Sequence, residues 1–188
     1  MRKLILIKHS RPEIVPALPA SQWRLSQDGR LRCRRLARKL SVHDPGVIVA
    51  SLEPKAVETG RIVADCLGRP LETASNLHEH DRRDVKFLQD RKEFQRLVAR
   101  FFQCPDKLVF GSETADQAHE RFAKAVDGVV ERFPGGNLAL VSHGTVITLF
   151  VSRAVGAEPM RFWKRLDMPA FVVLSLPDLS LLNVVERV

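Results

Sequence analysis

Short unbroken runs of apolar residues alternate along this chain with longer stretches in which apolar residues recur every three or four positions. The unbroken runs are typical of strands buried on both faces of a sheet, and the recurring pattern is typical of amphipathic helices. Strands are predicted at 4–7, 47–50, 71–74, 138–141, 171–176 and 181–185, and helices at 26–40, 54–67, 91–102, 114–133 and 145–155. This alternation predicts an α/β fold, a three-layer α/β/α sandwich around a mainly parallel sheet.

Two stretches interrupt the pattern. Residues 11–20 contain three prolines, which predicts a loop. A polar segment begins at Glu79, and residues 79–112 are interpreted as a small insert beside the active edge of the sheet. The whole chain, 1–188, is expected to form one domain, since its length suits a single core.

Composition narrows the class of protein. Hydrophobic residues make up 45% of the chain, enough for a core, and no apolar run is long enough to cross a bilayer. The apolar run after Met1-Arg2-Lys3 is only four residues long, so it is interpreted as a strand rather than a signal peptide, and a cytoplasmic location without membrane contact is expected. The three cysteines lie far apart and favour neither a disulfide framework nor a zinc site.

The net charge of +8 suits phosphorylated small molecules as well as nucleic acids. Much of the excess lies within 24–39, where the pattern favours the solvated outer face of a helix over a nucleic-acid site. Tyrosine is absent and other aromatic residues are sparse, which argues against a stacking platform for single strands. Nucleic acid is therefore the less favoured partner, and the oligomeric state is not predicted.

Candidate chemistry lies directly after the predicted strands. His9 follows the first strand and His143 follows the strand at 138–141, while Lys55 and Glu79 come soon after two others. Ligands of open parallel sheets bind at the carboxyl ends of the strands, so these groups are expected to meet. A neutral imidazole can attack phosphorus, cations can hold its oxygens, and a carboxylic acid can protonate the leaving alcohol. The residues alone leave a structural role for the histidines equally open.

Five short motifs, in order, resemble those of the histidine phosphatase superfamily, which has the phosphoglycerate mutase-like fold. The family carries Arg-His-Gly after its first strand, then Leu-Thr-x-x-Gly, Ser-x-x-x-Arg-Ala-x-x-Thr, Leu-x-Glu and a final His-Gly. The corresponding segments here are Lys8-His9-Ser10, Leu25-Ser26-Gln27-Asp28-Gly29, Ser51-Leu52-Glu53-Pro54-Lys55-Ala56-Val57-Glu58-Thr59, Leu77-His78-Glu79 and Val141-Ser142-His143-Gly144.

The resemblance implies a role for each matching residue. His9 would become a transient phosphohistidine, His143 would bind phosphoryl oxygens, and Glu79 would donate the proton, with Asp81 as the reserve donor. The flanking His78 and His80 are expected to be incidental surface residues. The phosphate-binding set would comprise Lys8, Lys55, Ser10, Arg11 and Gly144, with no metal and no cofactor.

Both family arginines are replaced by lysines, Lys8 and Lys55. Lysine keeps the charge but lacks the planar fork that fits two phosphate oxygens. Arg11, Arg82 or Arg83 could supply a replacement fork.

These observations predict a metal-independent phosphomonoester hydrolase acting on a small phosphorylated substrate or a phosphoprotein. Two alternatives remain: a catalytically weakened protein that binds or senses phosphate-bearing ligands, and a phosphoglycerate mutase-type phosphotransferase. The short insert favours a phosphatase, because a mutase must shield its intermediate from water. Substrate choice is assigned to the loops 11–23 and 79–112, which do not identify the leaving group.

Overall fold

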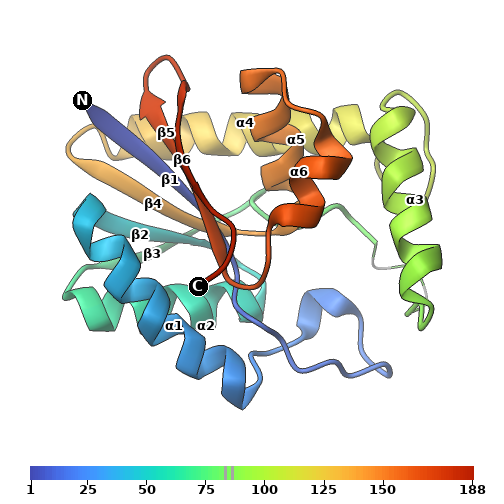
Figure 1. Cartoon of the computed structure of the whole chain (residues 1–188), viewed down its shortest axis with the longest axis horizontal. Coiled ribbons are helices and arrows are strands. Elements are labelled where there is room, and N and C mark those ends of the chain that lie inside the picture. The colour runs from blue at the N-terminus through green and yellow to red at the C-terminus, as the bar shows by residue number, and fades with distance from the viewer. Residues whose placement is uncertain (83, 86) are drawn as a thin grey trace.

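The computed structural model describes residues 1–82, 84–85 and 87–188 (Figure 1). Within these residues a six-stranded sheet has the order β3-β2-β4-β1-β5-β6. The strands are β1 (Arg2–Lys8), β2 (Pro45–Ser51), β3 (Leu71–Ala74), β4 (Asn137–Ser142), β5 (Ala170–Leu176) and β6 (Leu181–Val185). The first four run parallel, while β5 and β6 form an antiparallel hairpin beside β1. The mainly parallel sheet is confirmed.

Helices cover both faces of the sheet and produce the predicted three layers (Figure 1). One face carries α1 (Gln27–Leu40) and α2 (Pro54–Leu67), and the other carries α4 (Ala115–Arg132), α5 (Gly144–Val155) and α6 (Pro159–Arg165). Among the described residues between β3 and α4, the chain is irregular apart from α3 (Arg91–Gln103), which packs onto the core on the α4–α5 side. Two short 3₁₀ turns, Ala20–Gln22 and Ser41–His43, complete the described elements.

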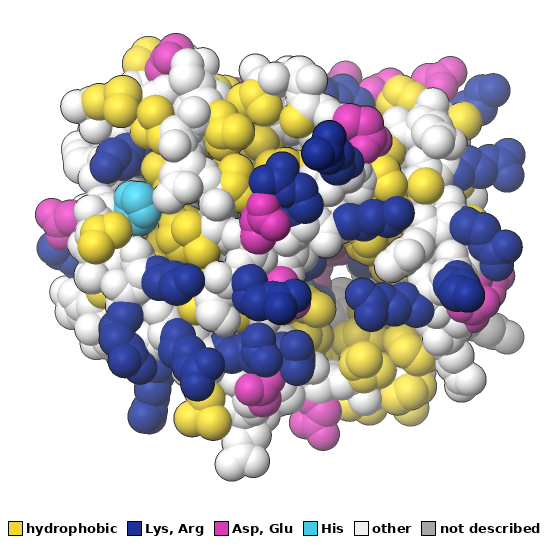
Figure 2. Space-filling model, in the orientation of Figure 1, with side chains coloured by type: hydrophobic (Ala, Val, Ile, Leu, Met, Phe, Trp, Pro, Cys, Tyr) yellow, Lys and Arg dark blue, Asp and Glu magenta, His cyan; other side chains and the backbone are white. Residues whose placement is uncertain are grey.

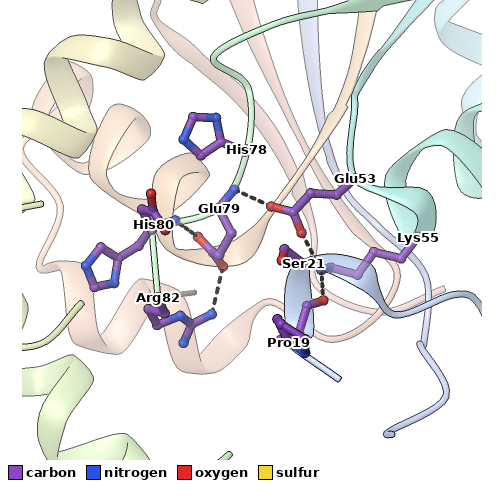
Figure 3. Close-up of a pocket in the computed structure, with 10 residues that line it drawn as sticks. Pro19, Ser21, Glu53, Lys55, His78, Glu79, His80 and Arg82 are labelled. Carbon is purple, nitrogen blue, oxygen red and sulfur yellow. Dashed lines mark hydrogen bonds and ion pairs between the residues drawn. The ribbon is translucent and has the colours of Figure 1, made fainter. Parts of the chain in front are cut away.

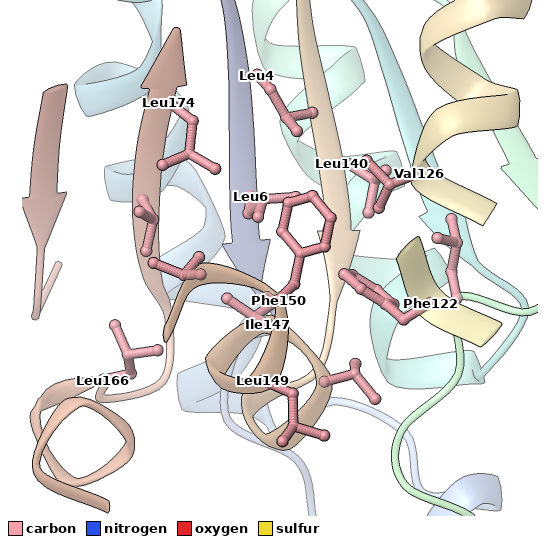
Figure 4. Close-up of a cluster of buried hydrophobic side chains, with 14 of the residues drawn as sticks. Leu4, Leu6, Phe122, Val126, Leu140, Ile147, Leu149, Phe150, Leu166 and Leu174 are labelled. Carbon is pink, nitrogen blue, oxygen red and sulfur yellow. The ribbon is translucent and has the colours of Figure 1, made fainter. Parts of the chain in front are cut away.

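The β1 strand shows why its sequence is an unbroken apolar run. Leu4 and Leu6 point into the core beneath α4 and α5, where Phe122 and Phe150 pack (Figure 4). Ile5 and Ile7 point to the opposite side of the sheet, into the core beneath α1 and α2. Successive strand residues face opposite sides, so a strand covered on both faces needs apolar residues at every position.

The starts of two helices follow from capping side chains. Ser26 accepts a hydrogen bond from the backbone N–H of Gly29 (3.0 Å), and Thr114 forms a reciprocal capping box with Gln117. These hydrogen bonds satisfy backbone donors that the first helical turn leaves without partners.

No element was predicted for 156–169, yet α6 lies there. It has seven residues, too few for a clear apolar period, and Glu158 caps it by accepting from the backbone N–H groups of Met160 and Arg161. Pro159 in its first turn was the available signal, since proline is favoured at that position.

The basic segment at 24–39 is the solvated outer face of α1, as predicted. Its arginines and Lys39 are exposed, apart from the half-buried Arg32, while Cys33, Leu36 and Leu40 face the core. Figure 2 shows Lys and Arg side chains gathered over this part of the molecule. Within the described residues, no helix combines the length and apolar character that a membrane span requires.

Candidate active site

Two histidines meet at the carboxyl ends of β1 and β4. These strands pair in parallel with Lys8 opposite Ser142, so the next residue of each strand, His9 and His143, comes side by side. Their ring centroids lie 5.2 Å apart at an interplanar angle of 62°. His9 is 6% exposed and His143 is fully buried. The register of the sheet thus brings the two predicted histidines together, and we call them the imidazole pair.

A hydrogen bond sets the tautomer of His9. Its Nδ1 lies 2.7 Å from the carbonyl oxygen of Ser10, which can only accept, so Nδ1 carries the hydrogen and Nε2 keeps its lone pair. Burial lowers the pKa of His9 well below its usual value, and the nearby His143 and Lys55 lower it further. The ring is therefore neutral near pH 7 and competent as a nucleophile at Nε2.

His143 has one partner and one unpartnered nitrogen. Its Nε2 lies 2.9 Å from the hydroxyl of Ser51 and 3.6 Å from Oε1 of Glu53. Its Nδ1 is buried and has no hydrogen-bond partner among the described residues. Burial, followed by the charge of Lys55, lowers the pKa of His143 well below its usual value. A buried nitrogen without a protein partner is available to a ligand.

Glu79 lies at the start of α5. Its carboxylate accepts hydrogen bonds from the backbone N–H groups of Thr145 (3.2 Å), Val146 (3.3 Å) and His80 (2.9 Å). Arg82 approaches it at 3.9 Å (Figure 3). Burial alone would raise the pKa of Glu79, but Arg82, His143 and these N–H donors outweigh it and lower the pKa to about 2. Glu79 is therefore a carboxylate at the N-terminus of a helix, a position that favours anions.

The lysines that replace the family arginines both hold internal partners. Lys8 donates to the carbonyl oxygen of Leu166 (2.7 Å), and burial lowers its pKa to about 8. Gly144 makes room for it, because a Cβ there would lie 3.0 Å from Cε of Lys8. Lys55 donates to the carbonyl oxygen of Ala20 (2.6 Å) and forms an ion pair with Glu53.

The segment after His9 is held by α1 and α2. Ser10 donates its hydroxyl to the carbonyl of Gly29 (2.7 Å) and its backbone N–H to the hydroxyl of Thr59 (3.0 Å). Gly29 is required by this close approach, since a Cβ there would lie 2.1 Å from the carbonyl oxygen of Arg11. Two of the sequence motifs therefore serve to position the backbone beside His9.

The candidate replacement arginines lie in different places. Arg11 is exposed and its Nη1 lies 3.2 Å from Asp28, outside the residues that line the cavity described below. Arg82 lines that cavity, and its guanidinium lies 5.0 Å from the ring of Phe94. Arg83 lies outside the described residues.

The expectation that His78 and His80 are surface residues is wrong for His80. Its ring is 2% exposed and packs against Phe101 and Phe110, with centroid distances of 4.1 and 4.7 Å. The aromatic partners come from the segment after α3 and from α3 itself, which the local sequence around His80 does not show. His78 is half-buried and lines the cavity.

A cavity of about 250 Å³ lies over this charged region. Neither member of the imidazole pair is among its lining residues. Its lining is formed by Pro19, Ala20, Ser21, Glu53, Lys55, His78, Glu79, His80, Asp81 and Arg82 (Figure 3). Parts of both loops assigned to substrate choice, 11–23 and 79–112, therefore border it.

Sequence reasoning missed Glu53, which both lines the cavity and contacts His143. It lies two residues beyond β2 and directly before Pro54, the first residue of α2. Its place after a strand end was the signal that could have identified it. Within the described residues, no group of three or more His, Cys, Asp or Glu side chains is arranged to hold a metal ion.

Comparison with known proteins places this geometry in context. The sequence matches the histidine phosphatase superfamily (branch 1) over residues 16–177, a span that includes Lys55, Glu79 and His143 and begins after His9. No curated protein matches the chain.

Several solved structures share the fold. YhfR of Bacillus stearothermophilus is 19% identical, with a TM-score of 0.77 over 99% of this chain and 96% of that one. A mycobacterial glucosyl-3-phosphoglycerate phosphatase in complex with VO3 is 17% identical, with a TM-score of 0.77 over 100% of both chains. A putative alpha-ribazole-5'-P phosphatase of Escherichia coli is 18% identical, with a TM-score of 0.75 over 98% of this chain and 96% of that one. Because the family match spans most of its length, this chain belongs to the histidine phosphatase superfamily.

Proposed function

We propose that this protein is a metal-independent phosphomonoester hydrolase that works through a phosphohistidine on His9. The observation that carries the proposal is the imidazole pair, a neutral His9 with a free Nε2 lone pair beside a buried His143 with an unpartnered nitrogen. An attacking imidazole and a second group for the phosphoryl oxygens are what the first chemical step needs.

The reaction follows in two displacements. Nε2 of His9 attacks phosphorus, the bond from phosphorus to the ester oxygen breaks, and the alcohol leaves with a proton supplied by Glu79. Water then attacks phosphorus, the bond from phosphorus to Nε2 breaks, and inorganic phosphate leaves. Glu79 returns to its protonated form by taking a proton from the attacking water.

Glu79 needs a proton before the first step, although its pKa is about 2 without a ligand. A phosphate dianion beside the carboxylate raises that pKa, because the two negative charges repel and protonation relieves the repulsion. Substrate binding thus favours the protonated form of Glu79 that the first step needs. Asp81, which lines the same cavity, is the reserve donor.

Charge stabilisation is assigned to Lys8, Lys55, Gly144 at the start of α5, and the backbone around Ser10. Among the candidate replacements for the lost fork, Arg82 is favoured because it lines the cavity, whereas Arg11 pairs with Asp28 at the surface. A guanidinium at Arg82 can hold two phosphoryl oxygens at once.

A small organic phosphate is the favoured substrate class. The cavity of about 250 Å³ is smaller than a typical drug-sized pocket. The names of two structural neighbours describe phosphatases of small phosphorylated metabolites, which supports the same class here. A phosphoprotein, presenting only one side chain to the cavity, is the second substrate class.

The internal partners of Lys8 and Lys55 favour a second candidate, a protein that binds phosphate-bearing ligands with little turnover. The two candidates differ in whether the protein hydrolyses phosphomonoesters in a reaction that depends on His9.

The experiment is a hydrolysis assay with a panel of phosphomonoesters, with and without a chelator. We expect turnover that the chelator leaves unchanged and that His9→Ala lowers by about a thousandfold or more, since removal of a nucleophile abolishes most of the chemical acceleration. His119→Ala, a half-buried histidine on α4, is the matched control and keeps its activity. Equal activity of His9→Ala and the unaltered protein would overturn the proposal, and absence of turnover on every ester would favour the binding protein.

A further inference from the structure

The carboxylate of Glu53 occupies an unusual position for a negative charge in a site that is to bind phosphate. Its side chain is 10% exposed, and it contacts groups from three separate parts of the chain. Oε1 accepts from the backbone N–H of Glu79 (3.0 Å) and lies 3.6 Å from Nε2 of His143, while Oε2 pairs with Lys55. Figure 3 shows it between the segment that carries Glu79 and the side chain of Lys55.

These partners are the kinds of group that hold phosphoryl oxygens. The ammonium of Lys55 and the backbone N–H of Glu79 together form a cradle for an oxyanion, with the imidazole of His143 beside it. A carboxylate resembles a phosphoryl group in presenting charged oxygens at similar spacing. Glu53 thus fills the cradle with an anion that belongs to the protein itself.

A helix-capping role does not explain this placement. Glu53 is the residue before the first turn of α2, but its side chain makes no capping hydrogen bond. The carboxylate turns instead toward the cavity and His143, so its position serves the site rather than the end of the helix.

Because of this placement, the ammonium of Lys55 is already paired within the protein. Its ammonium is held between Glu53 and the carbonyl oxygen of Ala20, and its side chain is 6% exposed. A phosphoryl group that binds this ammonium therefore competes with Glu53 for it.

We propose that Glu53 is a specificity-determining residue, an internal anion beside His143 that a phosphoryl group must displace from Lys55 and the Glu79 N–H. This inference rests on the proposed function. Displacement weakens the binding of inorganic phosphate and of the smallest esters, which have no other contacts to offset it. The substrates selected are phosphomonoesters whose leaving group also contacts the cavity wall near His78.

The test is the affinity for inorganic phosphate, measured by isothermal titration calorimetry on three proteins. Glu53→Gln keeps the side-chain shape and an oxygen that can accept from Glu79 but removes the charge. We expect it to bind phosphate about tenfold more tightly than the unaltered protein, because removal of one nearby negative charge relieves repulsion of that order. Its KM should fall most for the smallest ester.

Glu58→Gln is the matched control. Glu58 is on α2 as well, but its carboxylate pairs with Arg24 and Arg30 outside the cavity. Glu58→Gln changes the net charge by the same amount as Glu53→Gln. It should leave the affinity for phosphate within about twofold of that of the unaltered protein, since exposed ion pairs contribute little. Glu53→Ala replaces Glu53→Gln if circular dichroism shows that the glutamine variant is unfolded.

The outcomes separate this inference from the proposed function. If folded Glu53→Gln binds phosphate no more tightly than the unaltered protein, or if neither binds it, the inference is wrong even where His9-dependent hydrolysis is observed. If Glu53→Gln binds phosphate more tightly while no protein hydrolyses any ester, the displacement of Glu53 stands and the hydrolase proposal fails.

Discussion

The imidazole pair and the charged groups above it are built in contrasting ways. His9 and His143 are fixed by the register of two paired strands and are almost completely buried. The charged rim, defined as Glu53, Lys55, Glu79 and Arg82, comes from helix starts and irregular chain, and its members pair with one another and with backbone groups. A sheet holds a nucleophile rigidly, whereas ion pairs among side chains can exchange partners when a ligand arrives.

The difference extends to the electrostatics. Burial keeps the imidazoles neutral, so their chemistry needs no rearrangement of charge. The rim charges satisfy each other in the absence of ligand, so a bound phosphate must compete for them. We therefore expect changes in the imidazole pair to act on the chemical step and changes in the rim to act more on affinity and on the leaving group.

After His9→Ala, the largest effect within this comparison is expected for His143→Ala. If His143 holds the developing phosphoryl charge as proposed, its loss should lower kcat by about a hundredfold to a thousandfold, with a smaller change in KM. Steady-state kinetics on one phosphomonoester measures both constants. A rise in KM with kcat unchanged would show that His143 only binds the ground state, and the contrast between pair and rim would fail.

A smaller effect is expected for Glu79→Gln, and it should depend on the leaving group. Without a proton donor, kcat for an alkyl phosphate should fall by about a hundredfold, since a poor leaving group needs the proton. Hydrolysis of p-nitrophenyl phosphate, whose phenolate leaves unaided, should change far less. Asp81→Asn is the comparison variant. If it shows the leaving-group dependence and Glu79→Gln does not, Asp81 is the donor.

The smallest effect is expected for Arg82→Ala. Loss of one charged hydrogen-bonding group should lower kcat/KM by about tenfold, mainly through KM. Arg11→Ala, which removes an arginine paired with Asp28 outside the cavity, should remain within about twofold. Thermal unfolding checks that the loss of the Arg82 contact with Phe94 has not unfolded the chain. Equal effects of the two variants on kcat/KM would show that Arg82 does not contact the substrate.

Much of the sheet and the imidazole pair could be predicted because their signals are local. An apolar run such as 4–7 requires cover on both faces, and a polar residue directly after it must lie at the edge where parallel strands end. His9 and His143 were found in this way, and the helices predicted at 26–40 and 114–133 begin at Ser26 and Thr114, whose side chains cap them.

The rest depends on contacts between distant segments. The burial of His80 requires Phe101 and Phe110, and the outward direction of Arg11 is set by Asp28 on α1. The pairing of Glu53 with Lys55 needs the backbone of Glu79 to close over it. Such partners are separated in sequence by up to about thirty residues, and neither composition nor periodicity records which of them will meet.

The most direct test of the central claim is to trap the phosphoryl group on the protein. The enzyme is mixed with a phosphomonoester, quenched in alkali, where phosphohistidine is stable, and analysed by peptide mass spectrometry. The account predicts a phosphoryl group on the peptide containing His9, formed within the first turnover and absent from His9→Ala. A phosphoryl group on another residue, or hydrolysis without any phosphorylated peptide in a protein that retains activity after His9→Ala, would contradict it.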